Sequence, residues 1–218
     1  MSRTIRVTGK GQIKVKPDIT RITISLEGLC RDYGDALRKS SQDTEKLKDL
    51  LASFNFERSD LKTLNFSVET EYESYNTDGT YRRRFVGYKF NHLMKVEFLS
   101  DNELLGRILY ALAKSPIKPE FRLSYTVSDP EAAKNKLLCK AIIDAQEKAA
   151  VLTQAAGVKL NDIQTIDYSW GQINFEVMPM AQMAMAAPVD EKASCYDMDI
   201  EPDDIEVTDT VTVVWEIG

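Results

Sequence analysis

The stretch Asp129–Gly157, DPEAAKNKLLCKAIIDAQEKAAVLTQAAG, has the pattern of one long amphipathic helix. An N-cap Asp followed by Pro is typical of a helix start, and a Gly at the far end often supplies the left-handed residue that ends a helix. Steps of three and four predict a buried stripe formed by Leu138, Ile142, Ala145, Ala149, Leu152 and Ala156. Small residues four apart also let the helix backbone approach its partner closely: Ala141, Ala145 and Ala149. We therefore predict a long helix lying across a β-sheet.

Alternating apolar and polar residues predict strands around this helix, at 19–27, 61–75, 81–99, 121–127, 162–170 and 205–217. Two more amphipathic helices are predicted at 32–54 and 101–114. Near the start, 4–7 and 12–16 are strand-like but are interrupted by Gly9 and Gly11. This interruption predicts either a tight hairpin or one strand with a bulge.

Two halves of the chain resemble each other in pattern. Residues 21–26 and 122–127 agree in polarity at each position, and a helical pattern follows both. After those helices, 60–64 matches 162–166 in the same way. We predict a single α+β domain over 1–218, with two related β-α-β-β units at 18–99 and 119–217 and antiparallel sheets packed against long helices. Chance similarity between amphipathic patterns is the alternative.

Composition excludes several classes of protein. The chain has 218 residues, 43% hydrophobic and 28% charged, with a net charge of -6, and this acidic balance argues against a nucleic-acid partner. No apolar run approaches the roughly 18 residues of a transmembrane segment. The start, MSRTIRVTGKGQ, lacks the apolar core of a signal peptide, so we expect a cytoplasmic protein, or an exported one if a leader has been removed.

Three cysteines suit neither a disulfide framework nor a zinc site, and Cys139 is expected to be a packed side chain.

Four stretches of the sequence together resemble the SIMPL-domain (YggE-like) family. They are Val7–Gly11 with Val15–Asp18, then Gly87-Tyr88, then Asp144-Ala145 with Lys148-Ala149, and finally Ile200–Pro202 with Val211–Val213. The resemblance implies an α+β fold, ring-like or channel-like homo-oligomers and a link to oxidative-stress defence; in the animal namesake it implies binding to a kinase. It implies no catalytic residues. The chain departs from the family in having Asp203 after the closing proline, where glycine is usual.

Candidate sites are few. His92 is the one histidine, and its place among apolar strand residues predicts a partly buried, hydrogen-bonded side chain over a catalytic one. Met178–Met185 carries four thioethers in eight residues, which suits either a Cu(I) site, with Cys195 as a further ligand, or an apolar contact segment. Oxygen-bearing residues at Asp197–Glu201 lack the Gly and Glu of a calcium loop. We expect no catalytic residues, no cofactor and no metal.

The segment 61–99 predicts a hairpin whose strands exceed the typical length of about five or six residues. Long strands leave edge groups and aromatic surface for a second subunit to cover, and four tyrosines are concentrated there: Tyr72, Tyr75, Tyr81 and Tyr88. We therefore expect a non-enzymatic interaction protein that associates with itself and can bind other proteins. Metal handling through Met178–Met185 is the first alternative, and an unrecognised hydrolase built around His92 is the second.

Overall fold

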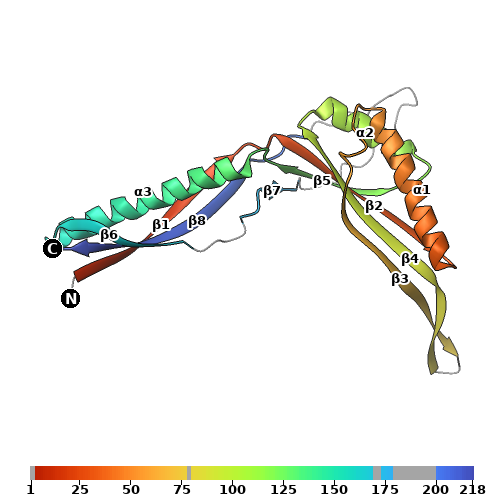
Figure 1. The fold of residues 1–218 in the computed structure, drawn as a ribbon, viewed down its shortest axis with the longest axis horizontal. Helices are drawn as coiled ribbons and strands as arrows, with labels where there is room; N and C mark the ends of the chain where they lie inside the picture. The colour runs from red at the N-terminus through yellow and green to blue at the C-terminus, as the bar shows by residue number, and fades with distance from the viewer. Residues whose placement is uncertain (1–2, 78–79, 169–172, 179–199) are drawn as a thin grey trace. The chain divides into compact units, whose positions relative to one another are not determined.

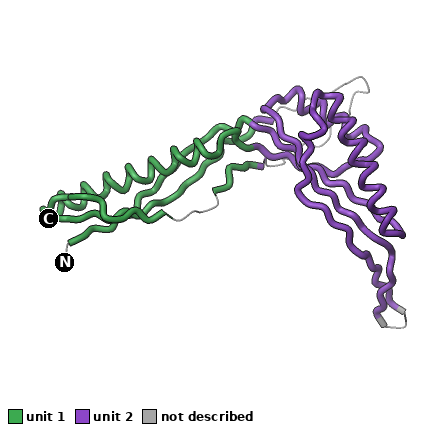
Figure 2. The backbone as a smooth tube through the Cα atoms, viewed as in Figure 1, with its two compact units in different colours: residues 1–18, 126–177, 202–218 green, residues 19–125, 178–201 purple. Residues whose placement is uncertain are grey.

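The computed structural model describes residues 3–77, 80–168, 173–178 and 200–218, and these divide into two compact units. Unit 1 comprises 1–18, 126–177 and 202–218, and unit 2 comprises 19–125 and 178–201 (Figure 2). The described residues form three helices and two antiparallel sheets, which confirms the predicted α+β class. The internal repeat stays a prediction.

Unit 1 is a three-stranded sheet under one long helix. Its strands are β1 (Arg3–Val15), β8 (Ile205–Ile217) and β6 (Leu160–Asp167), in the order β1-β8-β6. The helix α3 (Pro130–Ala156) lies along β1 and β8 (Figure 1). The prediction that it lies across a sheet is therefore wrong, because the helix follows the strand direction. The short strand β7 (Glu176–Val177) belongs to the same unit.

The ends of α3 match the sequence prediction. The Asp129 carboxylate accepts the Ala132 N–H at 2.8 Å, and Gly157 has a φ of 70°. The buried stripe, however, is displaced from the predicted one and consists of Leu137, Ala141, Ala145, Ala149 and Thr153. Leu152 is 51% exposed and Ala156 is also exposed, so their predicted burial is wrong, while Leu138 and Ile142 are half-buried beside the stripe. Cys139 is exposed, contrary to the expectation that it is packed.

The two glycines near the start explain this displacement. β1 is one continuous strand that pairs with β8 at every residue without a register shift, so neither a hairpin nor a bulge is present. A Cβ built on Gly9 would lie 2.0 Å from the Ala141 carbonyl oxygen, and one on Gly11 would lie 2.2 Å from the Leu137 oxygen. The glycines therefore let the helix backbone rest on the strand backbone, and short alanine side chains fill the contact.

Unit 2 is a sheet with two helices. It contains β2 (Ile19–Cys30), β3 (Lys62–Thr77), β4 (Thr80–Leu99) and all but the last residue of β5 (Glu120–Thr126), in the order β3-β4-β2-β5. The helices are α1 (Tyr33–Ala52) and α2 (Asn102–Lys114). Asp101 caps α2 as predicted, its carboxylate accepting the Leu104 N–H at 3.0 Å. The core between sheet and helices is built from fully buried side chains such as Ile22, Ile24, Leu47, Phe90 and Leu105.

Candidate functional site

The far end of the β3–β4 hairpin extends past the rest of its sheet. β2 pairs with β4 only as far as Cys30 opposite Tyr88, whereas β3 and β4 continue to pair as far as Thr77 opposite Thr80. We call 71–77 of β3 with 80–87 of β4 the ribbon; it protrudes beyond the N-terminal end of α1 (Figure 1). Two-stranded antiparallel ribbons are marginally stable alone in water, so a protruding one needs other contacts.

Aromatic rings run in sequence from the start of α1 onto the ribbon. Tyr33 meets Tyr88 edge-on at 5.6 Å between centroids, Tyr88 meets Phe85 at 5.3 Å, and Phe85 meets Tyr72 at 5.8 Å. A register shift between Glu71 and Tyr72 makes this possible, because it turns Phe85 to the face that carries Tyr88. The guanidinium of Arg83 lies 5.4 Å from the Tyr72 ring centroid.

The aromatic residues of the ribbon are exposed, and this includes Tyr72 and Phe85, whose rings touch each other. Tyr81 is 81% exposed, and Tyr72, Phe85 and Tyr75 are each between 41% and 45% exposed. Tyr88 is half-buried at the base of the ribbon. Large, rigid aromatic side chains exposed together with arginine are typical of surfaces that become buried in protein–protein contacts. The sequence pointed to these tyrosines, and the structure places three of them on one protruding element.

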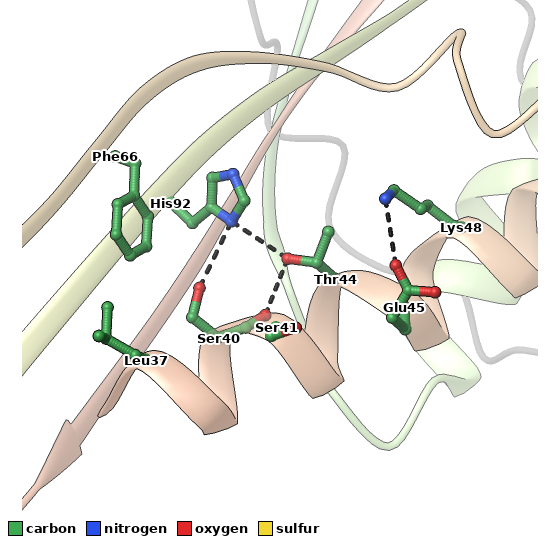
Figure 3. A pocket seen from close by; sticks show the side chains of 8 residues that line it. All are labelled: Leu37, Ser40, Ser41, Thr44, Glu45, Lys48, Phe66 and His92. Carbon is green, nitrogen blue, oxygen red and sulfur yellow. Dashed lines mark hydrogen bonds and ion pairs between the residues drawn. The ribbon is translucent and has the colours of Figure 1, made fainter. Parts of the chain in front are cut away.

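A hollow of about 280 Å³ lies between α1 and the β3–β4 strands and contains His92 (Figure 3). Its lining comes from one side of α1 and two strand residues: Leu37, Ser40, Ser41, Thr44, Glu45, Lys48, Phe66 and His92. The Phe66 ring meets the imidazole edge-on at 5.1 Å. The Glu45 carboxylate is bound by Lys48 at 3.1 Å and also by Arg58. The hollow is open and mixed in polarity.

Hydroxyl groups hold both nitrogens of the His92 ring. Thr44 Oγ1 donates its one proton to the Ser40 carbonyl at 2.8 Å, so it accepts from the ring Nδ1–H at 3.1 Å. Thr63 Oγ1 lies 2.9 Å from Nε2 and donates to it when the ring is neutral. The predicted partly buried, hydrogen-bonded histidine is confirmed. The threonine hydroxyls occupy both ring nitrogens and neither nitrogen is hydrogen-bonded to a carboxylate in the described part of the chain, so this geometry does not reproduce a Ser-His-Asp arrangement.

The protonation of His92 gives a testable pH dependence. Burial, with a smaller contribution from the Lys48 charge, lowers the pKa of His92 below its ordinary value of 6.5. As the pH falls below that value, the unfolded chain takes up a proton before the folded one, so folded stability falls with it. We expect the single imidazole resonance in NMR to titrate with a midpoint below 6.5. His92→Gln should flatten the stability profile between pH 7 and 5, and a midpoint at or above 6.5 would contradict this.

Charged side chains of α3 bind the outer backbone edge of β1. The Asp144 carboxylate accepts the Lys10 N–H at 2.6 Å, and the ammonium groups of Lys140 and Lys148 lie 3.1 Å and 3.5 Å from the carbonyls of Gln12 and Thr8. Asp144 also pairs with Lys148 at 2.7 Å, and these hydrogen bonds lower the pKa of Asp144. In this way α3 satisfies edge groups that a neighbouring strand would otherwise bind. Thr8, Lys10, Asp144 and Lys148 all belong to the stretches that carry the family resemblance.

The other predicted sites are placed as follows. Met180–Met185, Cys195 and Asp197–Asp199 lie outside the described residues, so the Cu(I) alternative stays a prediction. Among the residues that the structure describes, no group of three or more His, Cys, Asp or Glu side chains could hold a metal ion. Within the same part of the chain, no helix is long and apolar enough to cross a bilayer.

The fold and its protruding hairpin define this chain as an α+β protein of two antiparallel sheets. The profile of SIMPL, described as "Protein of unknown function (DUF541)", matches residues 5–215. The chain belongs to the SIMPL family. It is similar to "Uncharacterized protein YggE" of Escherichia coli (strain K12), at 23% identity over 215 residues, covering 98% of this chain and 82% of the relative. It is also similar to the "26 kDa periplasmic immunogenic protein" of Brucella melitensis, at 23% over 177 residues, covering 81% and 69%.

Sequence reasoning missed the hollow beside His92 and the edge contacts of Asp144. A signal for the first was present, because Ser40 and Thr44 interrupt the apolar stripe of α1, and buried hydroxyls require partners. A signal for the second was also present, because β1 contains two glycines and α3 carries charged residues of alternating sign four positions apart, Lys140, Asp144 and Lys148. Both signals need knowledge of which elements pack together.

Proposed function

We propose that this chain is a self-associating interaction protein and that the ribbon is its contact element. One observation carries the proposal: a two-stranded ribbon that leaves the sheet carries four exposed aromatic side chains, Tyr72, Tyr75, Tyr81 and Phe85. Exposed apolar surface gathered on one protruding element is costly in water unless a partner covers it. A role in oxidative-stress defence is proposed on the family resemblance alone. The cytoplasmic location stays a prediction, since a relative carries "periplasmic" in its name.

The test is the mass of the protein in solution, measured by size-exclusion chromatography with light scattering. We expect an oligomer at tens of micromolar, and smaller species after deletion of Thr77–Arg83 or in the variant Tyr72→Ser/Tyr81→Ser. The far-UV circular dichroism of these variants should stay that of the wild type, because the core of unit 2 lies away from the ribbon.

The matched control changes an equally exposed aromatic residue outside the ribbon. Phe121 is 46% exposed in β5, and Phe121→Ser should leave the mass unchanged. A wild-type protein that is strictly monomeric at tens of micromolar would refute the proposal, and so would a ribbon deletion that keeps the full mass.

A further inference from the structure

The sheet of unit 2 has two unpaired edges at the ribbon. β3 is the last strand in the strand order, so its outer edge is unpaired in the part of the chain that the structure describes. β4 is covered by β2 only up to Tyr88, so among the described residues no strand pairs with its outer edge from Thr80 to Gly87. Each edge presents backbone N–H and C=O groups that can form a ladder with another strand.

The two edges carry opposite charges on the same face. Alternation along β3 places Glu69, Glu71 and Glu73 on one face, and the strand register places Arg84 opposite Glu73 on that face. Arg84 pairs with Glu73 at 2.8 Å, while both side chains stay more than half exposed. Arg82, two residues from Arg84, lies on the same face. A guanidinium has five N–H donors, so Arg84 can serve a second carboxylate as well.

We propose that the outer edge of β3 in one copy pairs with the ribbon edge of β4 in the next copy. This inference rests on the self-association proposed above and names its mating surfaces. Pairing β3 with β3 would bring carboxylates together, and pairing β4 with β4 would bring guanidinium groups together. Only the mixed pairing places Glu69, Glu71 and Glu73 beside Arg82 and Arg84, and opposite charges across neighbouring strands stabilise a sheet.

A mixed pairing joins two different surfaces, so it is heterologous. Each copy then offers one free β3 edge and one free β4 edge, and copies add head to tail. Such an assembly closes into a ring if the rotation per copy permits and otherwise grows as a filament. In both cases the partner of the ribbon is a second copy of this chain.

Charge-reversed variants test this pairing by light scattering and analytical ultracentrifugation. Variant A, Glu69→Lys/Glu71→Lys/Glu73→Lys, makes both edges basic, and variant B, Arg82→Glu/Arg84→Glu, makes both acidic. We expect each alone to associate at least about tenfold more weakly than the wild type. An equimolar mixture of A and B should regain wild-type mass, because every contact between a copy of A and a copy of B again joins opposite charges.

Variant C carries all five changes and is the matched control for charge repulsion inside the ribbon. Its edges are complementary again, both within the chain and between copies, so it should assemble like the wild type. It should not co-assemble with the wild type. If the wild type associates but variants A and B still assemble fully, or their mixture does not recover, this pairing is wrong while self-association stands. A monomeric wild type refutes the self-association itself.

Discussion

Gly9→Ala is expected to lower the free energy of unfolding by about 3 kcal/mol, the upper end of what overpacking costs. The new Cβ would lie 2.0 Å from the Ala141 carbonyl oxygen and 2.5 Å from the Ala145 nitrogen. Both are backbone atoms of α3, so no side chain can rotate away to make room. The helix has to move off β1, and the contacts of its buried alanines weaken along with that movement.

Urea unfolding followed by circular dichroism measures this effect. Gly34→Ala is the control, because Gly34 lies in α1, has a negative φ and has no atom within 4 Å of the position of an added Cβ. Alanine is the better helix former, by up to about 1 kcal/mol, so the control should match or exceed wild-type stability. A Gly9→Ala protein with the urea midpoint of the wild type would show that α3 does not approach β1 closely.

The elements that sequence reasoning found are those with strong local signals. The last strand was predicted with its observed limits, Ile205–Ile217, because apolar residues alternate along it at every second position except Asp209. The start and end of α3 followed from Asp129, Pro130 and Gly157, whose chemistry acts within one helical turn. The single histidine was predicted to be hydrogen-bonded because a polar ring among apolar strand residues requires partners.

The features that were missed depend on residues far apart in the chain. Gly9 and Gly11 suggested a turn or a bulge, because a glycine within a strand pattern is usually read as a break in the strand. In the fold their role is steric, because the missing side chains leave space for the backbone of α3. Likewise, Asp144 and Lys148 have the spacing of an ordinary surface ion pair on a helix. Only the packing of α3 on β1 shows that they bind a strand edge.

The ribbon, too, could be predicted only in part from the sequence. Long strands and clustered tyrosines indicated a protruding hairpin, and both can be counted along the chain. The unpaired edge of β4 could not be derived in this way, because it depends on where β2 stops, at Cys30 opposite Tyr88. The opposite charges of the two strand edges can be recognised as complementary only once this edge of β4 is known to be unpaired.

Leu137→Ala is expected to cost about 2–5 kcal/mol of unfolding free energy, whereas Leu152→Ala should cost less than about 1 kcal/mol. Both leucines lie on α3, and the sequence pattern placed Leu152, not Leu137, in the buried stripe. In the fold Leu137 is fully buried with Ile13, Val127 and Ile205, and truncating it leaves a cavity. Leu152 borders an open hollow of about 430 Å³ beside Val7, so truncating it removes little packing.

The comparison is matched, because the same atoms are removed from the same helix and the change in helix propensity is the same. Urea unfolding of the two variants beside the wild type gives the difference directly, and differences between such variants are more robust than absolute burial sums.

Two apolar stripes run side by side on α3, one of larger residues and one centred on alanines. Gly9 and Gly11 favour the alanine stripe, since a helix can rest on a strand backbone only where its own side chains are short. Equal costs at the two leucines, or a larger cost at Leu152, would mean that the helix is rotated toward the larger stripe and that the glycine contact is not formed in solution.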